Sequence, residues 1–240
     1  MCWSESASVA MVGIGAAAAV VTWTRGEPRA IPVTLAFFAA MEALQVAGYQ
    51  VIDSCGTPAN RLVTIASYAH IALQPLFINA FGMALVGAHV SPAMRRAVYA
   101  LSALASVLLF ARLVPFGWAV PCTAGHALCG PDWCTVSGNW HLGWQVPYFN
   151  TWAPLLGAWL SAALEFPAYL LAVFILPLVY GAWRFALFHA AFGPALATLL
   201  TDNPNEMPAI WCLFSVGLAL VGLSPLVRRS LSPPGANRAA

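Results

Sequence analysis

The sequence contains no lysine, and all ten basic residues of the 240-residue chain are arginines. Pyridoxal phosphate and retinal are held through a Schiff base to a lysine amine. This absence therefore excludes a retinal protein of the Schiff-base type, which a chain with seven apolar segments would otherwise suggest.

Charged residues are also scarce. They make up 8% of the chain, whereas 61% of its residues are hydrophobic, and the mean hydropathy is +0.78. A soluble globule of this length could not cover its surface with so few polar groups. We therefore expect the lipid bilayer to be the main partner. The arginines occur singly or in pairs, without a basic face, which argues against a nucleic-acid partner.

Breaks rich in Arg, Pro, Gly and Asn divide the chain into long apolar segments. A spanning helix needs about 20 apolar residues. The segments predict an all-α, polytopic membrane protein with about seven transmembrane helices, in which residues 1–240 form a single transmembrane domain. The predicted helices cover residues 6–23, 31–52, 62–87, 97–116, 152–180, 185–200 and 207–227.

The arginines predict the orientation of these helices, because short cytoplasmic loops accumulate Arg. If the N-terminus is outside, only Arg61 falls in an outer loop. The C-terminal tail at 228–240 is then cytoplasmic, and the long Cys- and Trp-rich loop at 117–150 is extracytoplasmic. The arginines that fall on the cytoplasmic side are Arg25, Arg29, Arg95, Arg96, Arg184, Arg228, Arg229 and Arg238.

The cysteines fall in the outer loops or near the outer end of the last helix. In an oxidising compartment they predict disulfides, whose pairing the sequence does not determine. The alternative is a metal site in 117–150 with His126, Asp132 and His141, although the C-x-x-C pairs of structural zinc sites are missing. The disulfide candidates are Cys2, Cys55, Cys122, Cys129, Cys134 and Cys212.

Tryptophan and tyrosine are also concentrated in the loop at 117–150. Such residues are typical of the membrane interface. A functional alternative is that the loop forms a lid over a cavity that opens outward, with NWHLGW (139–144) at its centre.

Two consecutive apolar segments carry polar side chains where lipid is expected. Glu42, Gln45 and Tyr49 share one face of the second predicted helix, and His70 and Gln74 lie one turn apart in the third. An ionisable group in a spanning helix costs about 2.5 to 3.5 kcal/mol on insertion scales and is usually functional. We expect Glu42 and His70 to face each other in a cavity near the middle of the membrane.

Three further residues extend this set. Glu165 and His189 lie within the fifth and sixth predicted helices, and with Glu42 and His70 they could bind a divalent metal cofactor such as Zn, Fe or Mn. Glu206 precedes the last helix, where it suits either the helix N-terminus or the mouth of the cavity. Simple fastening of helices to one another is the competing interpretation.

A repeated spacing indicates an internal symmetry. His70-x4-Pro75 in the third helix and His189-x4-Pro194 in the sixth each follow a helix with a central glutamate. Because helices two to four run opposite to helices five to seven, the pattern predicts a 1+3+3 inverted repeat, a plan found in secondary transporters.

Several longer strings together resemble a bacterial family of seven-helix membrane proteins of unknown function. The resemblance implies a location in the bacterial inner membrane and no particular activity. A looser similarity is to seven-helix membrane metal hydrolases of the alkaline ceramidase and progestin-receptor type, but their H-x3-H motif near the last helix is missing. The strings are MCWSESASVAMVGIGAAAA (1–19), MEALQVAGY (41–49), SYAHIALQPLFINAF (67–81), NWHLGW (139–144) and NEMPAIWCLFS (205–215).

Three functions remain open at this point. The first is a transporter or sensor whose polar cavity binds a small molecule, a proton or a metal ion through Glu42, Gln45, Tyr49, His70, Gln74 and Glu206. The second is a metal-dependent membrane enzyme that acts on a lipid-like substrate. The third is a structural or assembly protein whose polar residues only fasten helices.

Overall fold

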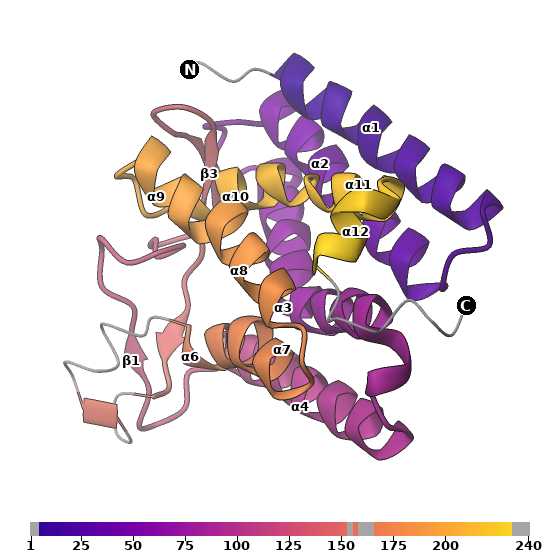
Figure 1. Ribbon diagram of the computed structural model, residues 1–240. Coiled ribbons are helices and arrows are strands. Elements are labelled where there is room, and N and C mark those ends of the chain that lie inside the picture. The colour runs from indigo at the N-terminus through magenta and orange to yellow at the C-terminus, as the bar shows by residue number, and fades with distance from the viewer. Residues whose placement is uncertain (1–4, 153–155, 158–165, 232–240) are drawn as a thin grey trace.

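The computed structural model describes residues 5–152, 156–157 and 166–231, and the chain is mostly helical (Figure 1). Four helices of the first half are long and apolar enough to cross a membrane: α1 (Glu5–Thr24), α2 (Ala30–Gln50), α3 (Pro58–Val86) and α4 (Pro92–Ala111). They pack in sequence order, each against the next. Gly15 lets α1 approach α2 closely, because a Cβ there would lie 2.9 Å from that of Ala39.

α3 and α4 begin four and five residues before the predicted helices, at ordinary capping sites. The Thr57 hydroxyl accepts from the Asn60 N–H at 3.4 Å, and the Ser91 hydroxyl accepts from the Met94 N–H at 3.2 Å. A proline follows each cap in the first helical turn. Polar caps followed by proline start a helix before the apolar run begins, so hydropathy alone places the start too late.

The second half consists of shorter, interrupted helices. α6 (Pro167–Leu170), the π-helix η2 (Leu171–Ile175) and α7 (Leu176–Val179) form one stretch, and α8 (Trp183–Ala190), the π-helix η3 (Ala191–Ala195) and α9 (Leu196–Leu200) form another. Gly193 interrupts η3 with φ −102° and ψ −105°. The chain ends in α10 (Met207–Ser215), α11 (Leu218–Leu223) and α12 (Pro225–Leu231).

The bend before the last helix is sharp, since Pro225–Leu231 is bent by 101° from Met207–Leu223. Counting that bent pair as one span, the described residues contain up to five helices that could cross a membrane. This number indicates an integral membrane protein. The stretch 185–200 is not one regular helix, because Gly193 interrupts it, and the stretch 207–227 bends sharply before Pro225. Of the stretch 152–180, the described part contains the helix 167–179.

Residues 117–150, which we call the outer segment, contain short strands that an all-α chain would lack. β2 (Cys134–Ser137) pairs antiparallel with β3 (Leu142–Gln145), and β1 (Val120–Pro121) pairs with β4 (Phe149–Asn150). Contacts with the helices hold the hairpin: the Asn60 side chain donates to the Thr135 carbonyl at 2.9 Å and accepts from its N–H at 2.9 Å. Four-residue strands are too short for an alternating pattern to reveal them.

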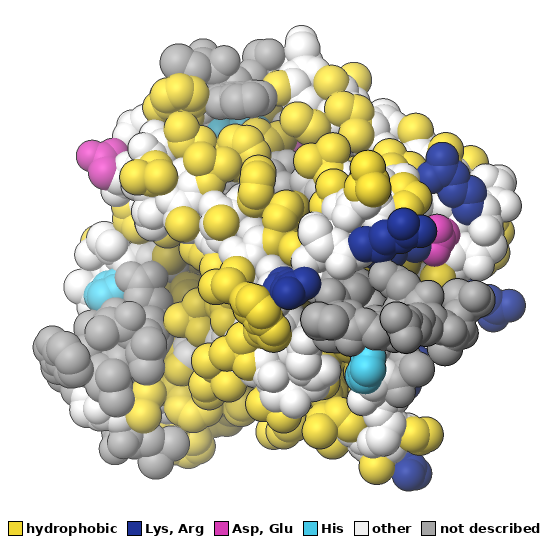
Figure 2. All heavy atoms as spheres, in the orientation of Figure 1, with side chains coloured by type: hydrophobic (Ala, Val, Ile, Leu, Met, Phe, Trp, Pro, Cys, Tyr) yellow, Lys and Arg dark blue, Asp and Glu magenta, His cyan; other side chains and the backbone are white. Residues whose placement is uncertain are grey.

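The opposite end of the helices gathers arginines. Arg25 donates to the Leu223 carbonyl at 3.1 Å, and the Arg228 guanidinium forms an ion pair with Glu27. Arg184 donates to the Ser230 carbonyl at 3.1 Å. Figure 2 shows hydrophobic side chains over much of the visible face, as expected for contact with lipid, with arginines mainly on the side of the C-terminus.

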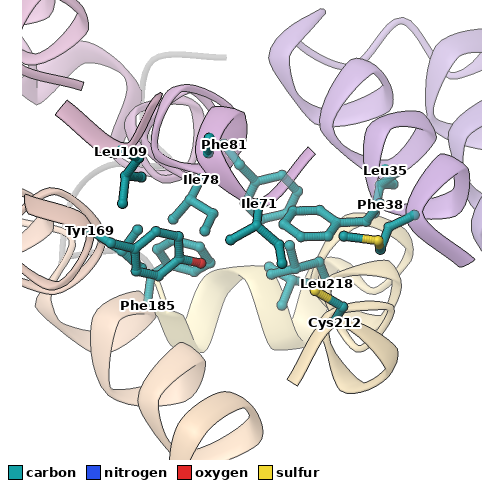
Figure 3. Packing of buried hydrophobic residues seen from close by; sticks show 14 of the residues in the cluster. Leu35, Phe38, Ile71, Ile78, Phe81, Leu109, Tyr169, Phe185, Cys212 and Leu218 are labelled. Atoms are coloured by element: carbon teal, nitrogen blue, oxygen red, sulfur yellow. The ribbon is translucent and has the colours of Figure 1, made fainter. Parts of the chain in front are cut away.

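Buried side chains from both halves form one hydrophobic core. In Figure 3, Ile71, Tyr169 and Cys212 approach one another from α3, α6 and α10. The side chains of the candidate functional site lie around this contact of α3, α6 and α10 and on the side of it that carries the outer segment.

Candidate functional site

Glu206 lies at the N-terminus of α10 and is completely buried. Its carboxylate accepts from the backbone N–H groups of Asn139 at 3.0 Å, of Trp140 at 2.5 Å and of His141. The Thr201 hydroxyl donates to it as well, at 2.6 Å. Glu206 therefore anchors the turn between β2 and β3 to α10, and its charge is met by donors rather than by an open cavity.

His141 continues this contact into the helices. Its Nδ1 lies 2.6 Å from the Tyr49 hydroxyl, its Nε2 bonds to the Gln45 Oε1, and the Gln45 Nε2 donates to the Ala209 carbonyl at 3.2 Å. Burial lowers the pKa of His141 to about 4. The neutral ring then donates from Nε2 to Gln45 and accepts at Nδ1 from Tyr49. We call Glu206, His141, Gln45 and Tyr49 the outer latch.

Glu42 and His70 are both buried, but they form no hydrogen bond with each other. The His70 Nε2 bonds to the Phe37 carbonyl at 2.8 Å, and the two rings stack with centroids 3.7 Å apart. Neither Glu42 oxygen has a hydrogen-bond partner among the described residues, nor does the His70 Nδ1. The described residues therefore show no direct bond between Glu42 and His70.

A partly open cavity of about 260 Å³ lies between α3, α6, η3 and α10, beneath the outer segment. Its wall is mostly apolar and carries no charged side chain. Of the residues predicted to bind a ligand, only Gln74 lines it. The lining residues are Ile71, Gln74, Ala127, Leu128, Phe166, Tyr169, Leu170, Pro194, Met207, Pro208, Trp211 and Cys212.

Three polar side chains contact one another at this cavity, and Trp211 forms part of its wall. The Tyr169 hydroxyl donates to the Gln74 Oε1, and the Gln74 Nε2 donates to the Cys212 Sγ at 3.2 Å. The Trp211 Nε1 is buried without a partner among the described residues. It rests against Gly193, where a Cβ would come within 2.3 Å of it. The break in η3 thus makes room for the indole.

The predicted metal ligands do not come together in the described part of the chain. His189 lies among aromatic rings, with centroids 5.6 Å from Phe174 and from Trp211, and its Nε2 has no partner there. Glu165 lies outside the described residues. The described ranges contain no group of three or more His, Cys, Asp or Glu side chains that could hold a metal ion, in the outer segment or elsewhere.

Four of the disulfide candidates are paired. Cys55 joins Cys134, linking the loop after α2 to β2, and Cys122 joins Cys129 within the outer segment. Cys212 is a free, buried thiol, so its assignment to a disulfide was wrong. The rotation of α10 turns its Sγ inward, where it accepts from Gln74 on α3. Cys2 lies outside the described residues.

Sequence reasoning missed Tyr169 and Trp211 and did not assign His141 to Gln45. Tyr169 and Trp211 are ordinary residues of apolar segments, and only the packing of α6 against α10 brings both to Gln74. His141 did carry a signal, since it is the histidine of the polar–aromatic string NWHLGW, but nothing in the string identifies its partner on α2.

Comparison with known proteins adds a family but no activity. No curated protein and no solved structure matches the chain. Residues 6–232 match the model of a family of unknown function, DUF5765, and the chain therefore belongs to that family.

Proposed function

We propose that this protein binds a small, mainly apolar molecule in the cavity beside Gln74, as a membrane-embedded sensor or transporter. The observation that carries the proposal is the cavity itself, of about 260 Å³. Protein interiors are close-packed and leave few voids larger than a water molecule. A concave space with apolar walls and a few converging polar groups is typical of small-molecule sites.

The elements around the cavity support a role in binding. Ala127 and Leu128 cover it from the loop that the Cys122–Cys129 disulfide closes. Pro194 lines it from the interrupted helix η3, and π-helices occur frequently at functional sites. The disulfide-closed loop would fix the shape of one side of the binding site, and the irregular helix η3 would let another side adjust to a ligand.

We further propose seven membrane spans in the bacterial inner membrane, with the N-terminus outside. The interrupted stretches 167–179, 183–200 and 207–223 supply the spans beyond α1 to α4. The arginine contacts at one end and the disulfides at the other support this orientation, because arginine accumulates on the cytoplasmic side and disulfides form outside. The 1+3+3 inverted repeat stays a prediction.

A second candidate function, proton binding at Glu42, has an observation of its own. This carboxyl is completely buried, and both its oxygens lack hydrogen-bond partners among the described residues. An unpaired carboxylate in an apolar interior is very costly, so such a group holds a proton until a partner or water reaches it. Membrane transporters and pumps use buried carboxyl groups of this kind as proton relays. No comparable observation favours the metal-dependent enzyme.

The binding proposal is tested with a small apolar probe. Radiolabelled 2-acetylnaphthalene is dialysed to equilibrium against the protein in lipid nanodiscs, with empty nanodiscs subtracted. We expect saturable binding at one site per chain. Leu170→Trp fills the cavity and should abolish this binding, whereas Leu171→Trp, at a neighbouring side chain that is 58% exposed, should preserve it. Equal binding by both variants, or none by the unmodified protein, would sink the proposal.

A further inference from the structure

Three carbonyl oxygens at the cavity each accept a hydrogen bond already. The Gln74 Oε1 accepts from the Tyr169 hydroxyl. In the outer segment, the Ala127 carbonyl accepts from the Tyr148 hydroxyl at 3.0 Å. The neighbouring Leu128 carbonyl accepts from the Val146 backbone N–H at 2.7 Å. A carbonyl oxygen can accept a second bond, but none of these three is left without a donor.

Donors, in contrast, are left over. The Gln74 amide has a second N–H beyond the one that it gives to the Cys212 Sγ, and the Cys212 thiol carries a weak donor of its own. The Trp211 indole N–H is buried without a partner among the described residues. A buried donor without an acceptor costs about 1 to 3 kcal/mol. A ligand that brings an acceptor would remove that cost.

The wall also sets the charge of the ligand. No Asp, Glu, Arg, Lys or His side chain is among the described residues that line the cavity. An ionised ligand would lose its hydration there without meeting an opposite charge, which is strongly unfavourable. An uncharged molecule with a large apolar surface fits the rest of the wall.

We infer that the ligand is a neutral, mainly apolar carbonyl compound whose oxygen accepts from Gln74, Trp211 or Cys212. This inference rests on the binding function proposed above and adds the chemical class of the ligand. It requires no covalent step. The carbonyl oxygen supplies an acceptor for these donors, and the apolar body occupies the space beneath Leu128.

The test compares 2-acetylnaphthalene with 2-isopropenylnaphthalene, which has nearly the same shape but carries a CH₂ group in place of the carbonyl oxygen. Both are titrated against the unmodified protein in nanodiscs by equilibrium dialysis, and each Kd is corrected for partition into empty nanodiscs. We expect the ketone to bind about tenfold more tightly, the effect of one well-made hydrogen bond. Equal Kd values would overturn the carbonyl inference while leaving the binding function intact; no saturable binding of either probe would overturn both.

Trp211→Phe then locates the donor. It removes the indole N–H and keeps an aromatic ring, so the preference for the ketone should fall to about threefold or less, with the Kd of the hydrocarbon unchanged. Trp183→Phe, at a side chain that is 48% exposed, is the matched control and should keep the full preference. An undiminished preference in Trp211→Phe would remove Trp211 from the inference. The comparison of the two probes on the unmodified protein stands even if that variant does not fold.

Discussion

The outer latch and several side chains buried among the helices differ in how completely their polar groups are hydrogen-bonded. In the outer latch, the Glu206 carboxylate meets three backbone N–H groups and a hydroxyl, and both ring nitrogens of His141 are bonded. In the interior, both oxygens of Glu42, the His189 Nε2 and the Trp211 Nε1 lack partners among the described residues. A satisfied network holds elements in place, whereas each unsatisfied buried group needs its own explanation, of which a bound ligand is one.

The largest effect is expected from breaking the outer latch at its carboxylate. Glu206→Ala leaves three backbone donors and the Thr201 hydroxyl without their acceptor, and we expect a loss of at least about 3 kcal/mol in the free energy of unfolding. The measurement is reversible unfolding in mixed micelles as the SDS fraction rises. Asp202→Ala is the control: Asp202 is exposed and accepts from the Asn139 side chain at 3.0 Å, so its loss should stay within about 1 kcal/mol. Equal losses would contradict the special role of Glu206.

The two disulfides should differ in the same assay. Cys55 and Cys134 are 79 residues apart, whereas Cys122 and Cys129 are only 7 apart. Closing the longer loop constrains the unfolded chain more, so replacing the first pair by serine should cost about 4 kcal/mol and the second about 2 kcal/mol. The reverse order would show that the outer segment is held mainly by its short loop.

His141 makes the outer latch dependent on pH. Its pKa in the folded protein is about 4, below the ordinary value of 6.5, so the folded state favours the neutral ring. The stability that depends on this ring is therefore complete above pH 6.5 and is lost as the pH falls towards 4, by about 3 kcal/mol in total. His141→Gln cannot be protonated in this range and should lack this component. We would subtract its unfolding free energies from those of the unmodified protein at each pH; a difference that does not change with pH would contradict the neutral assignment.

The smallest effect is expected at Glu42. Because its oxygens have no hydrogen-bond partners to lose among the described residues, the neutral, isosteric Glu42→Gln should change the free energy of unfolding by less than about 1 kcal/mol. Glu206→Gln, the same chemical change in the outer latch, should cost more, since an amide nitrogen cannot accept the bonds that the carboxylate accepts. Similar costs at both sites, measured by SDS unfolding, would remove the contrast between the two regions.

The sequence was informative where the chemistry was local. The length of the apolar segments predicts α1 to α4, and the clustering of cysteines in the predicted outer loops predicts disulfides, two of which are present. The site was harder to predict. Gln74 was found from its own polarity, but its partners Tyr169 and Cys212 depend on how α6 and α10 pack against α3.

Two expectations failed because helix geometry was extrapolated across elements. The polar faces of α2 and α3 predict that Glu42 and His70 face each other, yet the His70 Nε2 bonds to the Phe37 carbonyl on α2. The hydropathy of 185–200 predicts a continuous helix, whereas Gly193 interrupts it and leaves room for the Trp211 indole. The spacing of polar residues and the hydropathy of a segment do not determine how far a helix is rotated about its axis or where it is interrupted.

The most direct test of the account is to locate a small molecule in the cavity. With ¹³C-labelled Ile and Leu methyl groups in nanodiscs, we would record intermolecular NOEs from bound 2-acetylnaphthalene. We expect NOEs to the methyl groups of Ile71, Leu128 and Leu170, which line the cavity. In Leu170→Trp, the NOEs to Ile71 and Leu128 should disappear. NOEs only to lipid-facing methyl groups such as those of Leu171, which is 58% exposed, would contradict it.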